Sequence, residues 1–197
     1  MSAAARPQIR VIGDGFPHAE PGGPFGSDLI AAPDILHVAS VAAATPGGRD
    51  AVLFLVHSLE DETLVSFAAD IRVASDCAVT LRLIAASDIV TLTDTDAAWL
   101  FPGATTTEVV NRVLNLGPSL VAVSVGGTVS VTTRHEAWSV PGASGGFLGD
   151  LLRTLARRRA GGVTANELRE QGFRGARRAP VEPVTGGSGR ESAQSRR

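Results

Sequence analysis

The chain has 197 residues, of which 44% are hydrophobic and 19% charged, so it can bury the core of one substantial α/β domain. No stretch is apolar for long enough to span a bilayer, and the first residues lack the apolar segment of a secretion signal, so we expect a cytoplasmic protein. The only cysteine, Cys77, excludes an internal disulfide and a metal site built from several cysteines.

Charge is distributed unevenly along the chain. From Arg157 to the end there are ten Arg and four Glu, a balance of +6, whereas residues 1–156 hold eight Arg and sixteen acidic residues, a balance of −8. A basic tail on an acidic body can contact nucleic acid or an acidic membrane. Residues 176–197 are rich in Pro, Gly and Ser and lack the aromatic side chains that stack on bases, so we expect a disordered, solvated tail and no nucleic-acid or membrane partner.

The first thirty residues contain one short apolar segment, Ile9–Ile12, and then a glycine- and proline-rich run, so we expect residues 1–30 to be poorly ordered. Thr45–Gly48 predicts a turn, and Thr93 or Asp94 and then Thr107 are the expected caps of two later helices. Beyond residue 30, short apolar segments typical of buried strands alternate with amphipathic segments. The expected strands are 34–41, 64–70, 88–92 and 120–125, and the expected helices are 50–59, 77–86, 94–100 and 105–116.

This alternation predicts the fold class. Strands with unbroken apolar character are typical of a parallel sheet that is buried on both faces. We therefore expect a three-layer α/β domain, with a mainly parallel sheet and helices on both faces. The strand Leu120–Val125 should lie in the centre of the sheet.

The stretch after this strand has the parts of an anion site. The strand ends in Gly126 and Gly127, two short β-branched segments at 129–133 and 137–140 follow, and a glycine-rich loop at 141–146 opens onto a helix that starts near Phe147. Such a loop lets backbone N–H groups point at a phosphate, and the helix N-terminus adds a favourable dipole. The alternative interpretation is a tight connection without a ligand.

These motifs resemble those of the ribokinase-like (PfkB) carbohydrate kinase family. The family's Thr-x-Gly-x-x-Gly turn corresponds to 124–129, where the hydroxyl and the first glycine are kept and Val129 replaces the last glycine. Its Gly-Ala-Gly-Asp-x-Phe motif corresponds to 142–147, where Gly145 occupies the position of the aspartate that acts as catalytic base. The resemblance implies a nucleotide site at Ser124, Gly126 and Gly127 and a phosphate-binding anion hole at Gly142, Ala143, Ser144, Gly145 and Gly146.

Two further segments are similar to motifs of the same family. Phe67–Arg72 resembles a strand that ends in Asp-x-Asn-x-Arg, with Asp70 and Arg72 kept. The family's Asn-x-x-Glu motif, linked to magnesium and phosphate, corresponds to Thr93 and Asp96, so the resemblance implies that Asp96 holds Mg²⁺ through a water. Without the family, Asp96 is a first-turn acid that the helix dipole alone explains.

The resemblance covers roughly residues 30 to 175, and it implies a partial ribokinase-like domain at 31–175. The family's chains are about twice as long, so we interpret this one as a truncated relative with altered motifs. The implied function is that of an ATP-dependent sugar or nucleoside kinase with weak or lost catalysis. Binding of nucleotide or sugar phosphate, with ATP and Mg²⁺, would then remain. The alternative is a non-catalytic structural or regulatory remnant that acts through a protein partner or as a homo-oligomer.

Two other chemistries find little support in the sequence. The segment 142–146 satisfies the Gly-x-Ser-x-Gly pattern of a hydrolase nucleophile, with Ser144 in the central position. The histidine that this chemistry needs should follow later, but none occurs after His135. The four histidines of the chain are scattered without the spacing of a metal site, and we expect His37 to be a core residue or one that supports a neighbouring site residue.

Overall fold

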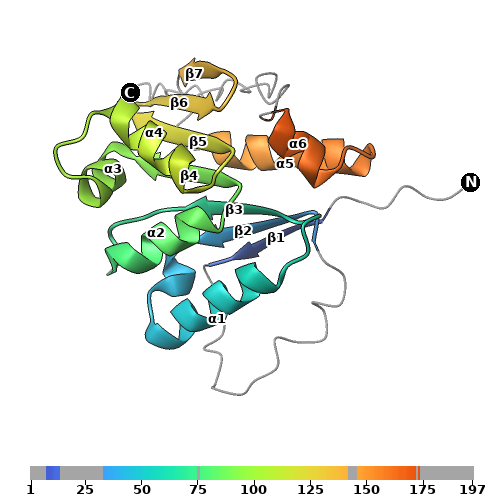
Figure 1. Cartoon of the computed structure of the whole chain (residues 1–197), viewed down its shortest axis with the longest axis horizontal. Coiled ribbons are helices and arrows are strands. Elements are labelled where there is room, and N and C mark those ends of the chain that lie inside the picture. Colours follow the sequence, from blue (N-terminus) through green and yellow to red (C-terminus); the bar gives the residue numbers. More distant parts are fainter. Residues whose placement is uncertain (1–7, 14–32, 75, 142–145, 172, 174–197) are drawn as a thin grey trace, which may run out of the picture.

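The computed structural model describes residues 8–13, 33–74, 76–141, 146–171 and 173. They form one seven-stranded sheet in which the strands lie in the order of the sequence (Figure 1). The first five strands are parallel to one another, and the sixth and seventh continue from the fifth as an antiparallel meander. The strands are β1 (Ile9–Ile12), β2 (Ile35–Ala39), β3 (Leu64–Ala68), β4 (Ile89–Thr93), β5 (Leu120–Val125), β6 (Thr128–Thr133) and β7 (Ala137–Pro141).

Helices cover both faces of the sheet (Figure 1). The connections between the parallel strands place the first four α-helices on one face, and the last two pack on the other. The predicted three-layer α/β fold is therefore confirmed. The helical elements are the 3₁₀ turn η2 (Ser40–Ala43), α1 (Pro46–Ser58), α2 (Cys77–Ala85), α3 (Asp94–Leu100), α4 (Thr106–Leu116), α5 (Phe147–Ala160) and α6 (Ala165–Glu170).

The two faces of each strand enter different cores. On β2, Leu36 and Val38 pack into the core under α1–α4, whereas Ile35 packs into the core under α5 and α6. The strand β5 pairs with β4 on one side and β6 on the other, and four of its six residues are buried. The prediction that this strand is central and buried is confirmed.

The structure corrects three expectations about element ends. Thr45–Gly48 is not a free turn, because Thr45 caps α1 and Pro46 occupies its first position, where a missing N–H costs nothing. The cap of α4 is Thr105 rather than Thr107, because Glu108 lies three residues after Thr105 and completes a capping box with it. Ile9–Ile12 forms β1, so the sheet begins before residue 31.

Two arginines attach α5 and α6 to the amino edge of the sheet. Arg159 donates from Nη1 to the Glu62 carboxylate, at 3.0 Å, and from Nη2 to the Glu62 carbonyl, at 2.8 Å. Arg169 forms a two-pronged ion pair with Asp88, at 2.6 and 3.2 Å, and Asp88 also accepts from the Val65 amide. These contacts fix the second helical layer to the loops that lead into β3 and β4.

Candidate functional site

Among the described residues, those singled out by motif lie at one edge of the sheet. Thr93 and Ser124 are paired at the ends of β4 and β5, and Val125 pairs with Thr128 at the start of β6. Thr128 in turn pairs with Pro141 at the end of β7. In an open α/β sheet the edge at the carboxyl ends of the parallel strands is where ligands bind. We call this side of the molecule the carboxyl edge.

The backbone geometry of the turn between β5 and β6 accounts for the two glycines in it. Gly126 and Gly127 have φ of 55° and 81°, the left-handed pair of a two-residue type I′ hairpin turn, which favours glycine at both positions. A Cβ at either position would meet nothing within 4 Å, so the outer side of the turn is open. The half-buried Ser124 lies beside this turn. Its role, and that of both glycines, in binding a nucleotide stays a prediction.

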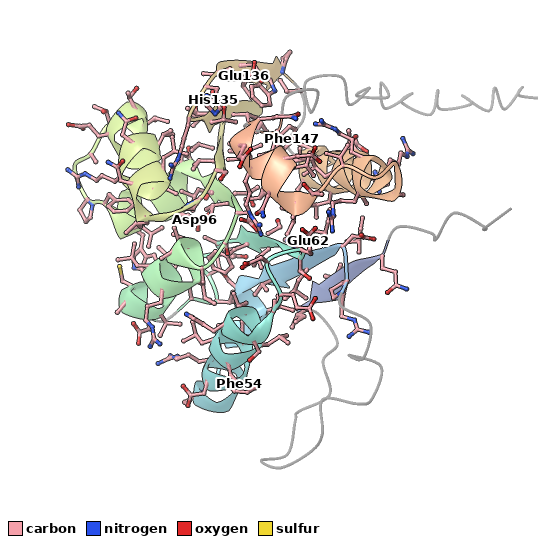
Figure 2. All side chains as sticks on the ribbon, turned by 45° about the vertical axis from the view of Figure 1, so that its right-hand side comes forward. Phe54, Glu62, Asp96, His135, Glu136 and Phe147 are labelled. Atoms are coloured by element: carbon pink, nitrogen blue, oxygen red, sulfur yellow. The ribbon has the colours of Figure 1, made fainter. Side chains whose placement is uncertain are left out.

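The helix α5 starts at the same edge. Gly146 is its N-cap and makes no side-chain cap bond, whereas α1, α2, α3, α4 and α6 each have a Thr or Asp cap. Five residues of extended chain reach at most about 18 Å, so the start of α5 stays near the end of β7 at Pro141. Phe147, the first residue of the helix, is labelled in Figure 2. The other predicted anion-hole residues, 142–145, lie outside the described residues.

Asp96 lies inside the fold at the start of α3 (Figure 2), with 2% of its surface exposed. Its Oδ2 accepts from the Thr93 amide at 2.8 Å and from the Thr93 hydroxyl at 2.6 Å, which completes a capping box. Its Oδ1 accepts from the Ile71 amide, at 2.8 Å. Asp96 therefore connects α3 to the loop after β3, and these bonds account for its burial. A role in holding Mg²⁺ stays a prediction.

The loop after β3 is held by a chain of polar contacts. Ser40 at the end of β2 donates to the Ala68 carbonyl, at 3.0 Å, and accepts from the Asp70 amide, at 2.8 Å. The Asp70 carboxylate accepts from Nε and Nη2 of Arg72, and these hydrogen bonds, more than charge alone, lower the pKa of Asp70. The Arg72 side chain is 85% exposed at the carboxyl edge.

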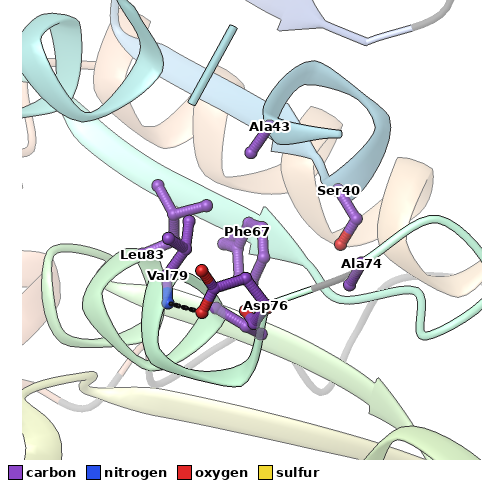
Figure 3. A pocket seen from close by; sticks show the side chains of 8 residues that line it. Ser40, Ala43, Phe67, Ala74, Asp76, Val79 and Leu83 are labelled. Atoms are coloured by element: carbon purple, nitrogen blue, oxygen red, sulfur yellow. Dashed lines mark hydrogen bonds between the residues drawn. The ribbon is translucent and has the colours of Figure 1, made fainter. Parts of the chain in front are cut away.

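A small hollow lies next to this loop, between η2, β3 and the start of α2 (Figure 3). Its wall includes Ser40, Phe67 and Asp76. Asp76 caps α2 through the Ala78 and Val79 amides and forms an ion pair with Arg49 at 3.1 Å. Because Ser40 and Asp76 are both engaged by the protein, the hollow does not by itself indicate a ligand. Among the described residues no group of three or more acidic, His or Cys side chains could hold a metal ion.

His37 occupies the middle of β2 and is half-buried, on the side of α5 and α6. Its Nδ1 lies 3.2 Å from the hydroxyl of the buried Ser66. Burial lowers the pKa of His37 below its usual 6.5, and the contact with Ser66 offsets only part of this effect. The expectation of a core position is therefore met only in part.

This shift predicts a loss of stability in mild acid. As pH falls below about 6.5, the unfolded chain protonates at His37 before the folded chain does, so the free energy of unfolding falls until the lower folded pKa is passed. A single group can contribute a slope of at most about 1.4 kcal/mol per pH unit. Denaturant titrations between neutral and acid pH should show this component in the wild type and in a His57→Gln control, which changes an exposed histidine. A His37→Gln variant with the same pH dependence would contradict the assignment.

Comparisons with known proteins identify the fold. No family model matches the chain, and no curated protein matches it. Among solved structures, the fructokinase of Xylella fastidiosa with bound ATP is similar with a TM-score of 0.61 and 17% identity, over 71% of this chain and 49% of that one. The aminoimidazole riboside kinase of Salmonella enterica gives a TM-score of 0.55 and 18% identity, over 62% and 48% of the two chains.

A sugar kinase of Pyrococcus horikoshii is also similar, with a TM-score of 0.51 and 20% identity, over 64% of this chain and 44% of that one. The chain thus spans about half the length of the solved structures that it matches. Among the described residues no helix is long and apolar enough to cross a membrane. The expected resemblance is confirmed at the level of architecture: the chain has the fold of the ribokinase-like carbohydrate kinases.

Proposed function

We propose that the chain binds a nucleotide or a related phosphate compound at the carboxyl edge and does not transfer phosphate at a useful rate. One observation carries the proposal: the open β5–β6 turn at Gly126 and Gly127 and the uncapped start of α5 at Gly146 lie at the same edge of the sheet. Backbone N–H groups at an uncapped helix start, with the helix dipole, favour a phosphate group.

The solved relatives in fold support this class of ligand. The fructokinase of Xylella fastidiosa was solved with ATP, and the aminoimidazole riboside kinase of Salmonella enterica with an ATP analog. By analogy, the nucleotide would lie against 124–127 with its phosphates toward the start of α5. Mg²⁺ would neutralise part of the phosphate charge, and Asp96, whose Oδ1 accepts from the Ile71 amide, is the acid that the resemblance assigns to the metal.

The absence of a base supports the second half of the proposal. Gly145 stands where the resemblance places the aspartate that takes the proton from the sugar hydroxyl. The next acid along the sequence is Asp150, in the first turn of α5, and its carboxylate pairs with Arg153 on the same helix. Phosphoryl transfer depends on positioning and charge stabilisation, and half of the kinase chain length has no counterpart here.

The proposal is tested by titrating the chain with ATP, ADP and a sugar phosphate, with and without Mg²⁺, and following thermal unfolding. A ligand at about one hundred times its Kd adds about 2.7 kcal/mol to the stability of the folded state, which raises the Tm by several degrees. A dose-dependent shift for the nucleotides supports the proposal. No shift with any of these ligands would contradict it and would favour the non-catalytic role that acts through a protein partner.

The location of the ligand is tested by Gly142→Val. A branched side chain in the loop should keep the phosphates away from the backbone amides, so we expect the nucleotide-dependent shift in Tm to be lost. Gly47→Val is the matched control, because a Cβ at Gly47, in the first turn of α1, meets nothing within 4 Å. If Gly142→Val keeps the wild-type affinity in calorimetry, the ligand binds elsewhere.

A further inference from the structure

The outer edge of β1 carries backbone groups that no described strand pairs with. The Ile35 amide donates to the Gln8 carbonyl, and Ile9 is in register with Ile35, so Gln8, Arg10 and Ile12 direct their N–H and C=O groups toward β2. The alternate residues, Ile9 and Val11, therefore direct theirs away from the sheet. An edge of this kind is a template for another strand.

One face of this edge carries apolar side chains, of which Val11 is the most exposed. Val11 has 60% of its surface exposed, the highest fraction of any large apolar residue on a described strand. Val41, in η2, is 37% exposed and lies beside the end of β1: its Cγ1 is 3.5 Å from the place where a Cβ on Gly13 would be. Ile9, half-buried, continues the apolar strip on the same face. Ile9, Val11 and Val41 form what we call the β1 strip.

We propose that β1 pairs with β1 of a second copy of this chain, antiparallel and about a two-fold axis at Val11. In this arrangement the outward backbone groups of Val11 bond those of the second copy's Val11, and those of Ile9 bond those of its Gly13. The two Val11 side chains meet, and each Ile9 lies over a glycine next to the second copy's Val41. The two β1 strips thus complement each other and are both covered.

Charge disfavours the register with the axis at Arg10. An axis at Arg10 would place the two Arg10 side chains directly opposite each other, and like charges in that position are destabilising. With the axis at Val11, Arg10 lies opposite Ile12 of the second copy, so no like charges face each other directly. A two-fold interface uses the same patch on both subunits, and the β1 strip can cover itself in this way, which favours a second copy as the occupant. The pairing would be independent of the nucleotide site, which lies around β4, β5 and β7.

Sedimentation velocity over a wide range of protein concentration tests the proposal on the full chain. Val11→Pro removes an outward N–H without touching the ladder between β1 and β2, because Val11 does not donate to β2. Val11→Lys places charge on the axis as a second, independent variant. Leu116→Lys is the matched control, since Leu116 is 40% exposed at the end of α4 and far from the β1 strip in the sequence.

We expect a concentration-dependent dimer for the wild type and Leu116→Lys, and a monomer with an unchanged circular dichroism spectrum for both Val11 variants. The register is tested by oxidation in a Cys77→Ser background: Val11→Cys should form a disulfide-linked dimer, because opposed residues in such a pair have Cα atoms about 5.5 Å apart, and Arg10→Cys should not. A wild-type monomer at every concentration, or a dimer that survives both Val11 substitutions, overturns the proposal. Either result leaves the nucleotide titration unaffected, so the two proposals fail separately.

Discussion

Arg169→Leu should lower the free energy of unfolding by about 2–4 kcal/mol, because it leaves the carboxylate of Asp88 without its cation and two backbone carbonyls without this donor. Only 24% of the Arg169 side chain and 16% of the Asp88 side chain are exposed. Arg169 also donates from Nη1 to the Asp61 carbonyl, at 2.6 Å, and from Nη2 to the Thr63 carbonyl, at 3.1 Å. Burial lowers its pKa, but the hydrogen bond and charge of Asp88 more than offset this, so the net pKa is raised.

The control for this prediction is an ion pair on the surface. Arg153→Leu removes the partner of Asp150, and 61% of the Arg153 side chain is exposed. Surface pairs contribute about 0–1 kcal/mol to stability, so the free energy of unfolding of this variant in a urea titration should be close to that of the wild type. Equal losses for the two variants would show that Arg169 does not fix α6 to the sheet.

The fold was predictable because its signals are local. The apolar runs that became β2 to β5 are buried on both faces, and unbroken runs of that length are typical of parallel strands.

The start of α1 was mispredicted because the Pro-Gly-Gly sequence at 46–48 suggests a turn. Thr45 reverses that preference, since its hydroxyl accepts from the Gly48 amide and makes the same residues the first turn of a helix.

The contacts between distant parts of the chain were not predictable from sequence. The pair between Arg169 and Asp88 joins residues 81 positions apart, and the excess of Arg after residue 157 suggested only solvated charge. In the same way, an acid at a helix start indicates a cap, but nothing in the sequence shows that Asp96 also accepts from the Ile71 amide. Such bonds depend on which loops the sheet order brings together. The motif at 124–129 was easier, because two consecutive glycines after a strand are typical of a hairpin turn.

The largest expected effect concerns catalysis: neither the wild type nor Gly145→Asp should transfer phosphate from ATP to a sugar at a useful rate. A positioned general base contributes about 10²- to 10⁴-fold to such a reaction. Asp150, the acid in the first turn of α5, lies five residues after the position where the motif places the base. Orientation of the two reactants can contribute about 7–11 kcal/mol, which is more than one base supplies, and the variant restores the base alone.

A coupled assay for sugar-dependent ADP release, run on both proteins with hexoses, pentoses and nucleosides, measures this directly. Robust turnover by the wild type would contradict the proposed loss of catalysis, because the chain would then possess a base that the motif alignment does not identify. Turnover by Gly145→Asp alone would show that a sugar is already oriented at the carboxyl edge and that only the proton acceptor is missing. Gly149→Asp serves as a matched control, since it adds a carboxylate within α5, four residues beyond the expected position of the base. If both variants stay inactive while still binding nucleotide, the barrier lies in positioning the sugar, because a second carboxylate near the phosphates changes the charge of the site without holding the acceptor hydroxyl in line.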